Sequence, residues 1–248
     1  LAESNSVNLM PIDSEPSAIW QCLRGENNNI SKLIITASGG PFRNTPVRSL
    51  PNVTPTEALQ HPTWEMGQKI SVDSATMMNK AFEVIEARWL FNVPWENIEV
   101  IVHPESIIHS MVEFVDGSML AQLSTPDMCL PIQYALTYPD RAFSDRVQTN
   151  LAEIGRLDFE EPDTERFPSL NLARRAGEEG GALPAVLNAA NEVAVEAFCN
   201  REIEFTAITK IVADTMDAHE LISAPTLEEI LEADSWARKT AQNLALSL

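Results

Sequence analysis

The chain has 248 residues, of which 44% are hydrophobic, and its 36 acidic and 17 basic side chains give a formal net charge of -19. This length and apolar content predict a globular fold with a substantial core. The negative charge argues against nucleic acid or an anionic membrane as a partner, because no basic patch offsets it. No run is apolar enough to span a membrane, and the first residues lack signal-peptide character. Three widely spaced cysteines, Cys22, Cys129 and Cys199, lack metal-ligand spacing and indicate a reducing compartment, for which we expect the cytoplasm.

The first part of the chain alternates between helix, strand and loop. Pro16 suits a helix start, and we expect a helix over residues 17–23. Residues 25–29 predict a turn, and the β-branched run 32–36 predicts a buried strand. Prolines interrupt residues 43–67, which predicts a long loop with one short helix; a loop of this length in a compact domain is usually functional.

The remainder predicts an α+β fold. A helix is expected over residues 74–91 with Asp73 or Ser74 as its N-cap, and Asp116-Gly117 predicts a tight hairpin. Strands are expected at 99–102, 110–115 and 118–123, and helices at 183–199, 205–219 and 227–246. The predicted organisation is a mixed-sheet domain over residues 1–139, a connecting segment over 140–168 and a C-terminal α-helical bundle over 169–248.

One predicted helix carries a stripe of polar residues that could bind a ligand. Spacings of three and four place Asn79, Glu83 and Glu86 on one face and bring Lys80 beside Glu83. Apolar residues cover most of the remaining circumference, so part of the stripe is expected to be buried, and buried charges need a metal, a partner or a ligand. The alternative is an exposed stripe with an ordinary helix salt bridge.

A second candidate is the tripeptide Asp13-Ser14-Glu15. If this segment is extended, its two carboxylates point the same way. A hard cation such as magnesium or manganese would relieve their repulsion through oxygen ligands. The alternative is a solvated loop or a helix cap.

Two loops offer further polar groups. Ser38-Gly39-Gly40 follows a hydrophobic strand, where glycine backbone amides and a serine hydroxyl could bind an anion, although a plain turn fits equally well. His61 and Trp64 lie in a loop that could close over a substrate, or that could simply be anchored to the core.

Taken together and in this order, these segments resemble the 1-deoxy-D-xylulose 5-phosphate reductoisomerases. The matching segments are residues 10–15 (MPIDSE), 36–43 (TASGGPFR), 61–67 (HPTWEMG), 69–80 (KISVDSATMMNK), 103–112 (HPESIIHSMV), 125–128 (TPDM) and 184–192 (PAVLNAANE). The resemblance implies rearrangement and NADPH-dependent reduction of the phosphorylated sugar 1-deoxy-D-xylulose 5-phosphate to 2-C-methyl-D-erythritol 4-phosphate, in isoprenoid precursor synthesis. It also implies a homodimer, with the hairpin at Asp116-Gly117 in the sheet concerned, and a cytoplasmic location, or a plastid one in a eukaryote.

The resemblance further implies roles for individual residues. Asp13, Glu15 and Glu83 match the ligands of a divalent metal, which would be manganese, magnesium or cobalt. The residues implied to bind substrate are Ser14, Ser38, His61, Trp64, Ser74, Asn79 and Lys80, with Ser38, Ser74, Asn79 and Lys80 at its phosphate. The implied catalytic set is Asp13, Glu15, Glu83, His61 and Lys80. Met66 matches the closing loop, and Gly67 and Met128 match the cofactor side.

The sequence departs from the family pattern in three respects. Members usually begin with a glycine-rich nucleotide-binding domain that this sequence lacks, so we expect a fragment that is inactive by itself. Pro16 stands where histidine is common, and Cys129 stands where a basic residue is common. Two other functions remain open from the sequence: a metal-dependent phosphosugar isomerase or aldolase without a redox step, and a non-catalytic remnant that only dimerises.

Overall fold

The computed structural model describes residues 2–26 and 29–248, so Asn27 and Asn28 of the predicted turn lie outside the described residues. The chain divides into two compact units, one made of Leu1–Ser38 and Glu86–Pro162 and the other of Gly39–Ile85 and Asp163–Leu248. Among the described residues, no helix combines the length and apolar character needed to cross a membrane.

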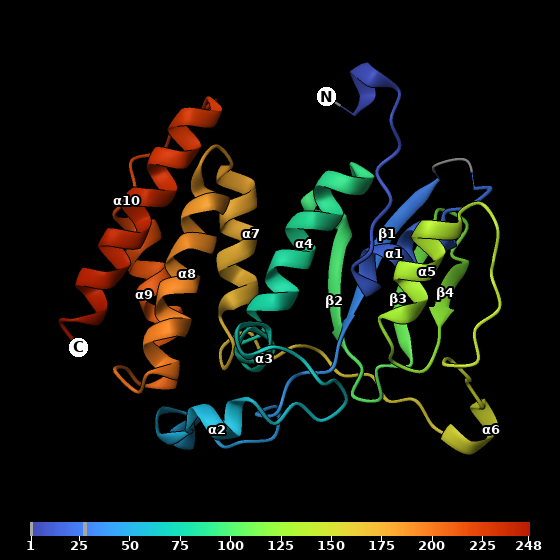
Figure 1. The fold of residues 1–248 in the computed structure, drawn as a ribbon, viewed down its shortest axis with the longest axis horizontal. Helices are drawn as coiled ribbons and strands as arrows, with labels where there is room; N and C mark the ends of the chain where they lie inside the picture. Colours follow the sequence, from blue (N-terminus) through green and yellow to red (C-terminus); the bar gives the residue numbers. More distant parts are fainter. Residues whose placement is uncertain (1, 27–28) are drawn as a thin grey trace. The chain divides into compact units, whose positions relative to one another are not determined.

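The first unit is built on a mixed four-stranded sheet with the order β2-β1-β3-β4 (Figure 1). Its strands are β1 (Ile30–Ala37), β2 (Ile98–Val102), β3 (Ile108–Phe114) and β4 (Met119–Leu123). β1 pairs with β2 in parallel and with β3 antiparallel, and β3 and β4 form the hairpin predicted at Asp116-Gly117. Gly117 has a φ of +84°, which suits glycine in a tight turn. The predicted α+β class with a mixed sheet is confirmed.

Besides the end of α4, which lies in this unit, the described residues of the first unit form helices α1 and α5 and several short elements. Helix α1 (Ser14–Cys22) packs on the sheet over β3 and β4, with α5 (Cys129–Thr137) beside it (Figure 1). Trp20 of α1 contacts Tyr134 and Tyr138, with ring centroids 5.0 and 4.9 Å away. The short elements are η1 (Glu3–Asn5), η3 (Trp95–Asn97) and α6 (Leu151–Ile154).

The second unit is helical, and its core is the bundle predicted for the C-terminal part. Helix α8 (Leu183–Cys199) packs against α7 (Ser169–Glu179), α9 (Phe205–Asp217) and α10 (Leu227–Ala245) (Figure 1). Fully buried side chains such as Leu187, Phe198 and Ile208 fill the bundle. The unit also contains η2 (Val47–Asn52), α2 (Pro55–Ala58), α3 (Gln68–Ala75) and the start of α4 (Met78–Phe91).

The two units interleave along the sequence, whereas the predicted domains were consecutive stretches. Residues 39–85 group with the C-terminal helices because α3 packs on α8 and η2 packs on α9. Part of the predicted connecting segment also has regular pairing, since Glu160 forms an antiparallel bridge with Val102 of β2.

The helix predicted over residues 74–91 is present as α4, but it begins at Met78, because residues 74 and 75 end a separate helix, α3. Helix α3 ends at Ala75 and α4 begins at Met78, and Met77 between them has a φ of +63°. At the end of α3 the Thr76 backbone N–H donates to the Val72 carbonyl at 3.0 Å, and the Thr76 hydroxyl donates to the carbonyls of Val72 and Asp73, 3.2 Å away in both cases. Asp73 and Ser74 therefore lie in the last turn of α3 and cap no helix N-terminus.

Candidate functional site

Asp13, Ser14 and Glu15 form the start of helix α1. The Asp13 carboxylate caps the helix by accepting from the Ser14 backbone N–H at 2.8 Å, and the Ser14 hydroxyl donates to Glu15 at 2.6 Å. The segment is therefore not extended, and the cap considered as an alternative is present. The helix begins earlier than predicted because Pro16, in its first turn, lacks only an N–H that would have no helical partner.

Glu83 lies on helix α4, where both its oxygens accept hydrogen bonds from the same helix. Lys80 Nζ lies 2.6 Å from one carboxylate oxygen and Asn79 Nδ2 lies 2.7 Å from the other. Lys80 is 6% exposed and Glu83 only 1% exposed, so the expectation that part of the polar stripe is buried is confirmed. A charge pair at this depth is stable only when its remaining hydrogen-bonding groups are also satisfied, and the amide of Asn79 contributes to this.

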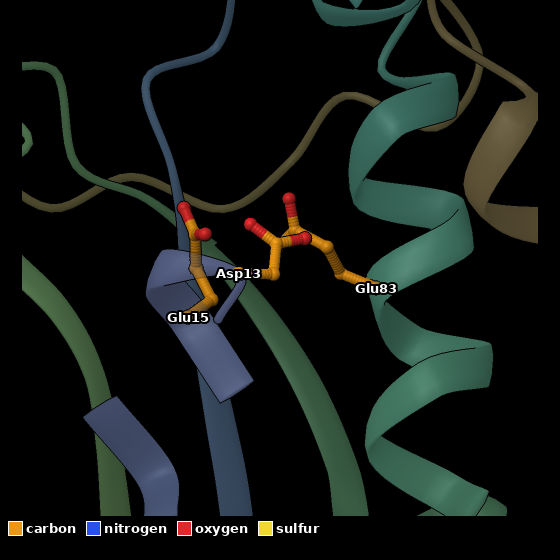
Figure 2. Close-up of side chains that lie close together, drawn as sticks. All are labelled: Asp13, Glu15 and Glu83. Atoms are coloured by element: carbon orange, nitrogen blue, oxygen red, sulfur yellow. The ribbon is translucent and has the colours of Figure 1, made fainter. Parts of the chain in front are cut away.

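Asp13, Glu15 and Glu83 form a group with the composition of a metal site. One ligand atom from each lies within 4.8 Å of the others, and Figure 2 shows the three side chains. Helix α4, which carries Glu83, continues into the unit that contains Asp13 and Glu15. Carboxylate oxygens around one magnesium ion lie about 3–4 Å apart, because metal–oxygen distances are about 2.1 Å. The three carboxylates would therefore have to move only slightly closer together to bind the ion. The donor set fits a hard divalent cation.

Ser74 lies near the C-terminal end of α3, close to the loop that follows β1. A Cβ atom on Gly40 would lie 2.6 Å from the Ser74 carbonyl oxygen, and Gly40 has a φ of +68°. Only glycine permits this approach of two backbones. Ser74 can offer its hydroxyl to an anion, but it does not stand at a helix N-terminus, where backbone amides and the helix dipole would assist it.

His61 is held in the loop between α2 and α3 by its own neighbours. Its Nδ1 accepts from the backbone N–H groups of Trp64, at 2.9 Å, and Thr63, at 3.2 Å. Burial, assisted by the positive charge of Lys80, lowers the pKa of His61 to about 4. A neutral ring whose Nδ1 accepts must carry its proton on Nε2, so His61 can act as a hydrogen-bond donor there.

The remaining predicted residues are Ser38, Trp64, Met66, Gly67 and Met128. Trp64 and Met66 are half-buried, and Gly67 is the N-cap residue of α3 without a side-chain cap. Met128 is 37% exposed at the start of α5, and the backbone N–H of Cys129 donates to Asp127 at 2.8 Å. Ser38 is half-buried after β1. Their roles toward substrate or cofactor stay predictions.

Asp73 and Asn191 were not identified from the sequence as functional candidates. Asp73 is 1% exposed and Asn191 is completely buried, and Asn191 Nδ2 donates to Asp73 at 2.8 Å. An asparagine in the middle of an alanine-rich apolar helix is the sequence signal that could have drawn attention to this pair.

Comparisons with known proteins match the chain along most of its length. A model of the 1-deoxy-D-xylulose 5-phosphate reductoisomerase C-terminal domain matches residues 9–91, and a model of the DXP reductoisomerase C-terminal domain matches residues 123–240. The 1-deoxy-D-xylulose 5-phosphate reductoisomerase of Desulforamulus reducens is 59% identical over 245 residues, covering 98% of this chain and 63% of that protein. The same enzyme of Heliobacterium modesticaldum is 55% identical, covering 97% of this chain and 61% of that protein.

Solved structures agree with these relatives. The reductoisomerase of Zymomonas mobilis in complex with NADPH is 47% identical with a TM-score of 0.93, covering 100% of this chain and 64% of that one. A reductoisomerase in complex with NADPH, fosmidomycin and magnesium is 43% identical with a TM-score of 0.89, covering 98% of this chain and 65% of that one. The chain thus spans less than two thirds of the length of these proteins.

The protonation of His61 gives a test of this geometry. We expect its ring to titrate with a midpoint near pH 4, in a proton NMR titration assigned with His61→Gln. The unfolded chain would bind a proton near pH 6.5 and the folded chain would not, so His61 should lower stability as the pH falls from about 6.5 to 4. His61→Gln should remove this part of the pH dependence. A midpoint near 6.5 would contradict the buried, neutral ring.

Proposed function

Because the chain belongs to the 1-deoxy-D-xylulose 5-phosphate reductoisomerase family, we propose that it carries the metal- and phosphate-binding part of such an enzyme. The reaction would rearrange 1-deoxy-D-xylulose 5-phosphate and reduce the product with NADPH to 2-C-methyl-D-erythritol 4-phosphate. The observation that carries the proposal is the group of three carboxylates, Asp13, Glu15 and Glu83. The cytoplasm, or a plastid in a eukaryote, stays the predicted compartment.

The three carboxylates would hold a divalent cation, magnesium or a similar ion, and two of the similar solved structures are complexes with magnesium. When bound, such an ion polarises a substrate carbonyl and stabilises negative charge on oxygen. The protein's own contribution is to hold the carboxylate ligands in place. The hydrogen bonds of Lys80 and Asn79 fix the Glu83 carboxylate on α4, and Ser14 fixes Glu15 on α1.

The phosphate of the substrate would be bound next to this group, by the hydroxyls of Ser38 and Ser74, Asn79, Lys80 and the Nε2–H of His61. Lys80 is the central residue of this set, because it pairs with Glu83 and its charge also acts on His61. An ammonium group has three donors, so its bond to Glu83 is compatible with a second, anionic partner. One buried cation would therefore join the metal side and the phosphate side of the site.

The similar structures do not favour the other two functions. The two structures described above, which match nearly the whole chain, are reductoisomerases in complex with NADPH, which disfavours an isomerase or aldolase without a redox step. A remnant that only dimerises would not need a buried carboxylate held by two donors, a costly arrangement without a ligand to bind.

We also propose a homodimer that forms through strand β4. This strand is an edge of the sheet, paired only with β3 among the described residues. Its apolar residues Met119, Leu120 and Leu123 are 49%, 42% and 37% exposed. An edge strand with exposed apolar side chains tends to be covered by another chain, and a second copy would bury these residues.

Metal binding can be tested on this chain directly. Manganese should raise its thermal unfolding midpoint, because a ligand of the native state alone stabilises it by about 2.7 kcal/mol at a hundredfold excess over Kd. Glu83→Gln should abolish the rise, as measured by calorimetry with and without the ion. The matched control is Glu178→Gln, which makes the same charge change at an exposed position of α7. An equal rise in Glu83→Gln would exclude Glu83 as a ligand.

The role of Lys80 can be tested in a complete enzyme that contains this chain. Lys80→Met should reduce kcat/KM by the equivalent of roughly 2–5 kcal/mol, the scale for leaving a buried charged group unpaired. Since Lys80 also supports Glu83, the informative comparison is between the phosphorylated sugar and the same sugar without phosphate. The variant should lose most of the preference for the phosphorylated form. An unchanged preference would remove Lys80 from the phosphate site.

The dimer can be tested by sedimentation. The unaltered chain should sediment as a dimer and Leu120→Lys as a monomer, because lysine would place a charge in the proposed interface. Leu136→Lys is the control, since Leu136 is 82% exposed on α5 of the same unit, and this variant should remain dimeric. A dimeric Leu120→Lys, or a monomeric unaltered chain, would refute the interface.

A further inference from the structure

We propose that Asp73 and Asn191 are positioning residues for the phosphate site, joining α3 to α8 in the orientation that presents Ser74, Asn79 and Lys80 to the anion. This inference rests on the proposed function, because it concerns the same phosphate group. All five residues lie in the second unit.

The Asp73 carboxylate is fixed through both of its oxygens. Lys69 Nζ lies 2.6 Å from one oxygen, and Asn191 Nδ2 donates to the other at 2.8 Å. The Asp73 side chain is almost fully buried, whereas the Lys69 side chain is 44% exposed, so Asn191 is the buried partner of the carboxylate. Burial raises the pKa of Asp73, while Lys69 and Asn191 act in the opposite direction, so the charged form depends on these two contacts.

Asn191 belongs to the buried core of the helical bundle. It is completely buried on α8, the helix at the centre of the bundle. Among the described residues its Oδ1 atom has no hydrogen-bond partner, so Asp73 is the partner that orients the amide. A buried polar group that leaves one atom unsatisfied is costly, and an apolar pair of similar volume would hold two helices together at least as well. The polar pair differs in that its hydrogen bond is directional, and this defines the orientation of α3 relative to α8.

Other contacts also hold the end of α3, and they couple the orientation of α3 to that of the first turn of α4. The Ser169 hydroxyl of α7 donates to the Thr76 carbonyl at 2.7 Å, directly after α3. Gly40 lies against the Ser74 carbonyl on another side. These contacts fix the position of the chain at the end of α3, and α4 with Asn79 and Lys80 begins directly after Met77. A rotation of α3 would therefore displace Ser74 and the first turn of α4 together.

The test is the binding of inorganic phosphate to this chain, measured by calorimetry well below the unfolding midpoint. Asp73→Asn keeps the size of the side chain and removes a negative charge beside Ser74, so electrostatics alone predicts tighter phosphate binding. Positioning predicts the opposite, because an amide cannot accept from both Lys69 and Asn191 through two oxygens. We expect about tenfold weaker binding, within the range that a small displacement of binding groups produces.

Further variants separate positioning from loss of stability. Asn191→Leu should weaken phosphate binding in the same way, and Asp73→Asn combined with Asn191→Asp should recover part of it by restoring one hydrogen bond in reverse. The control is Thr215→Val on α9, which removes a hydrogen bond at an equally buried position of the same unit. It should lower the unfolding midpoint and leave phosphate affinity unchanged.

The outcomes distinguish this inference from the proposed function. Phosphate binding by Asp73→Asn that equals or exceeds that of the unaltered chain would overturn the positioning role, as would an equal loss in Thr215→Val. A double variant no better than Asp73→Asn alone would contradict the direct pairing. If the unaltered chain does not bind phosphate, or binds it no better than Lys80→Met does, the phosphate site itself is wrong and the positioning role fails with it.

Discussion

The rest of the candidate site depends on the burial of the Glu83 carboxylate. A carboxylate that is 1% exposed is tolerated in a fold only when cations or hydrogen-bond donors replace the water it has lost. Lys80 and Asn79 do so at spacings of three and four, which requires this segment to be α-helical. In the proposed function, the substrate phosphate would be a second buried anion beside the same ammonium group. In a chain of net charge -19, such local pairing has to take the place of a general positive field.

The second unit meets a similar constraint at Asp73, and the same reasoning explains the architecture around it. The two buried carboxylates of Asp73 and Glu83 lie close together in sequence, but their hydrogen-bond partners come from different helices. Glu83 accepts from two residues of α4, whereas Asp73 accepts from Lys69 of its own helix and also from Asn191, more than a hundred positions further along the chain. The C-terminal bundle is therefore part of what shapes the segment between α3 and α4, as well as the core of its unit.

Local chemistry allowed much of the fold to be predicted. The β-branched run around Leu33, the Asp116-Gly117 hairpin and the helix over Leu183–Cys199 depend on side-chain periodicity and turn preference, which are properties of neighbouring residues. The predictions failed where one residue changes the direction of the chain. Thr76 and Met77 interrupt an otherwise continuous helical pattern, and Thr76 is held by Ser169 as well as by its own turn.

By itself, the sequence identified the candidate residues that the structure brings together: the carboxylates Asp13, Glu15 and Glu83, and Lys80 beside Glu83, because residue type and helical spacing can be read from the chain. It also determined the family, through segments whose order and identity are specific. Only the tertiary structure decided that Asp73 is buried against Asn191, that Ser169 hydrogen-bonds to Thr76 after the end of α3, and that Gly40 lies against Ser74. These features depend on contacts between distant segments, and no local preference encodes such contacts.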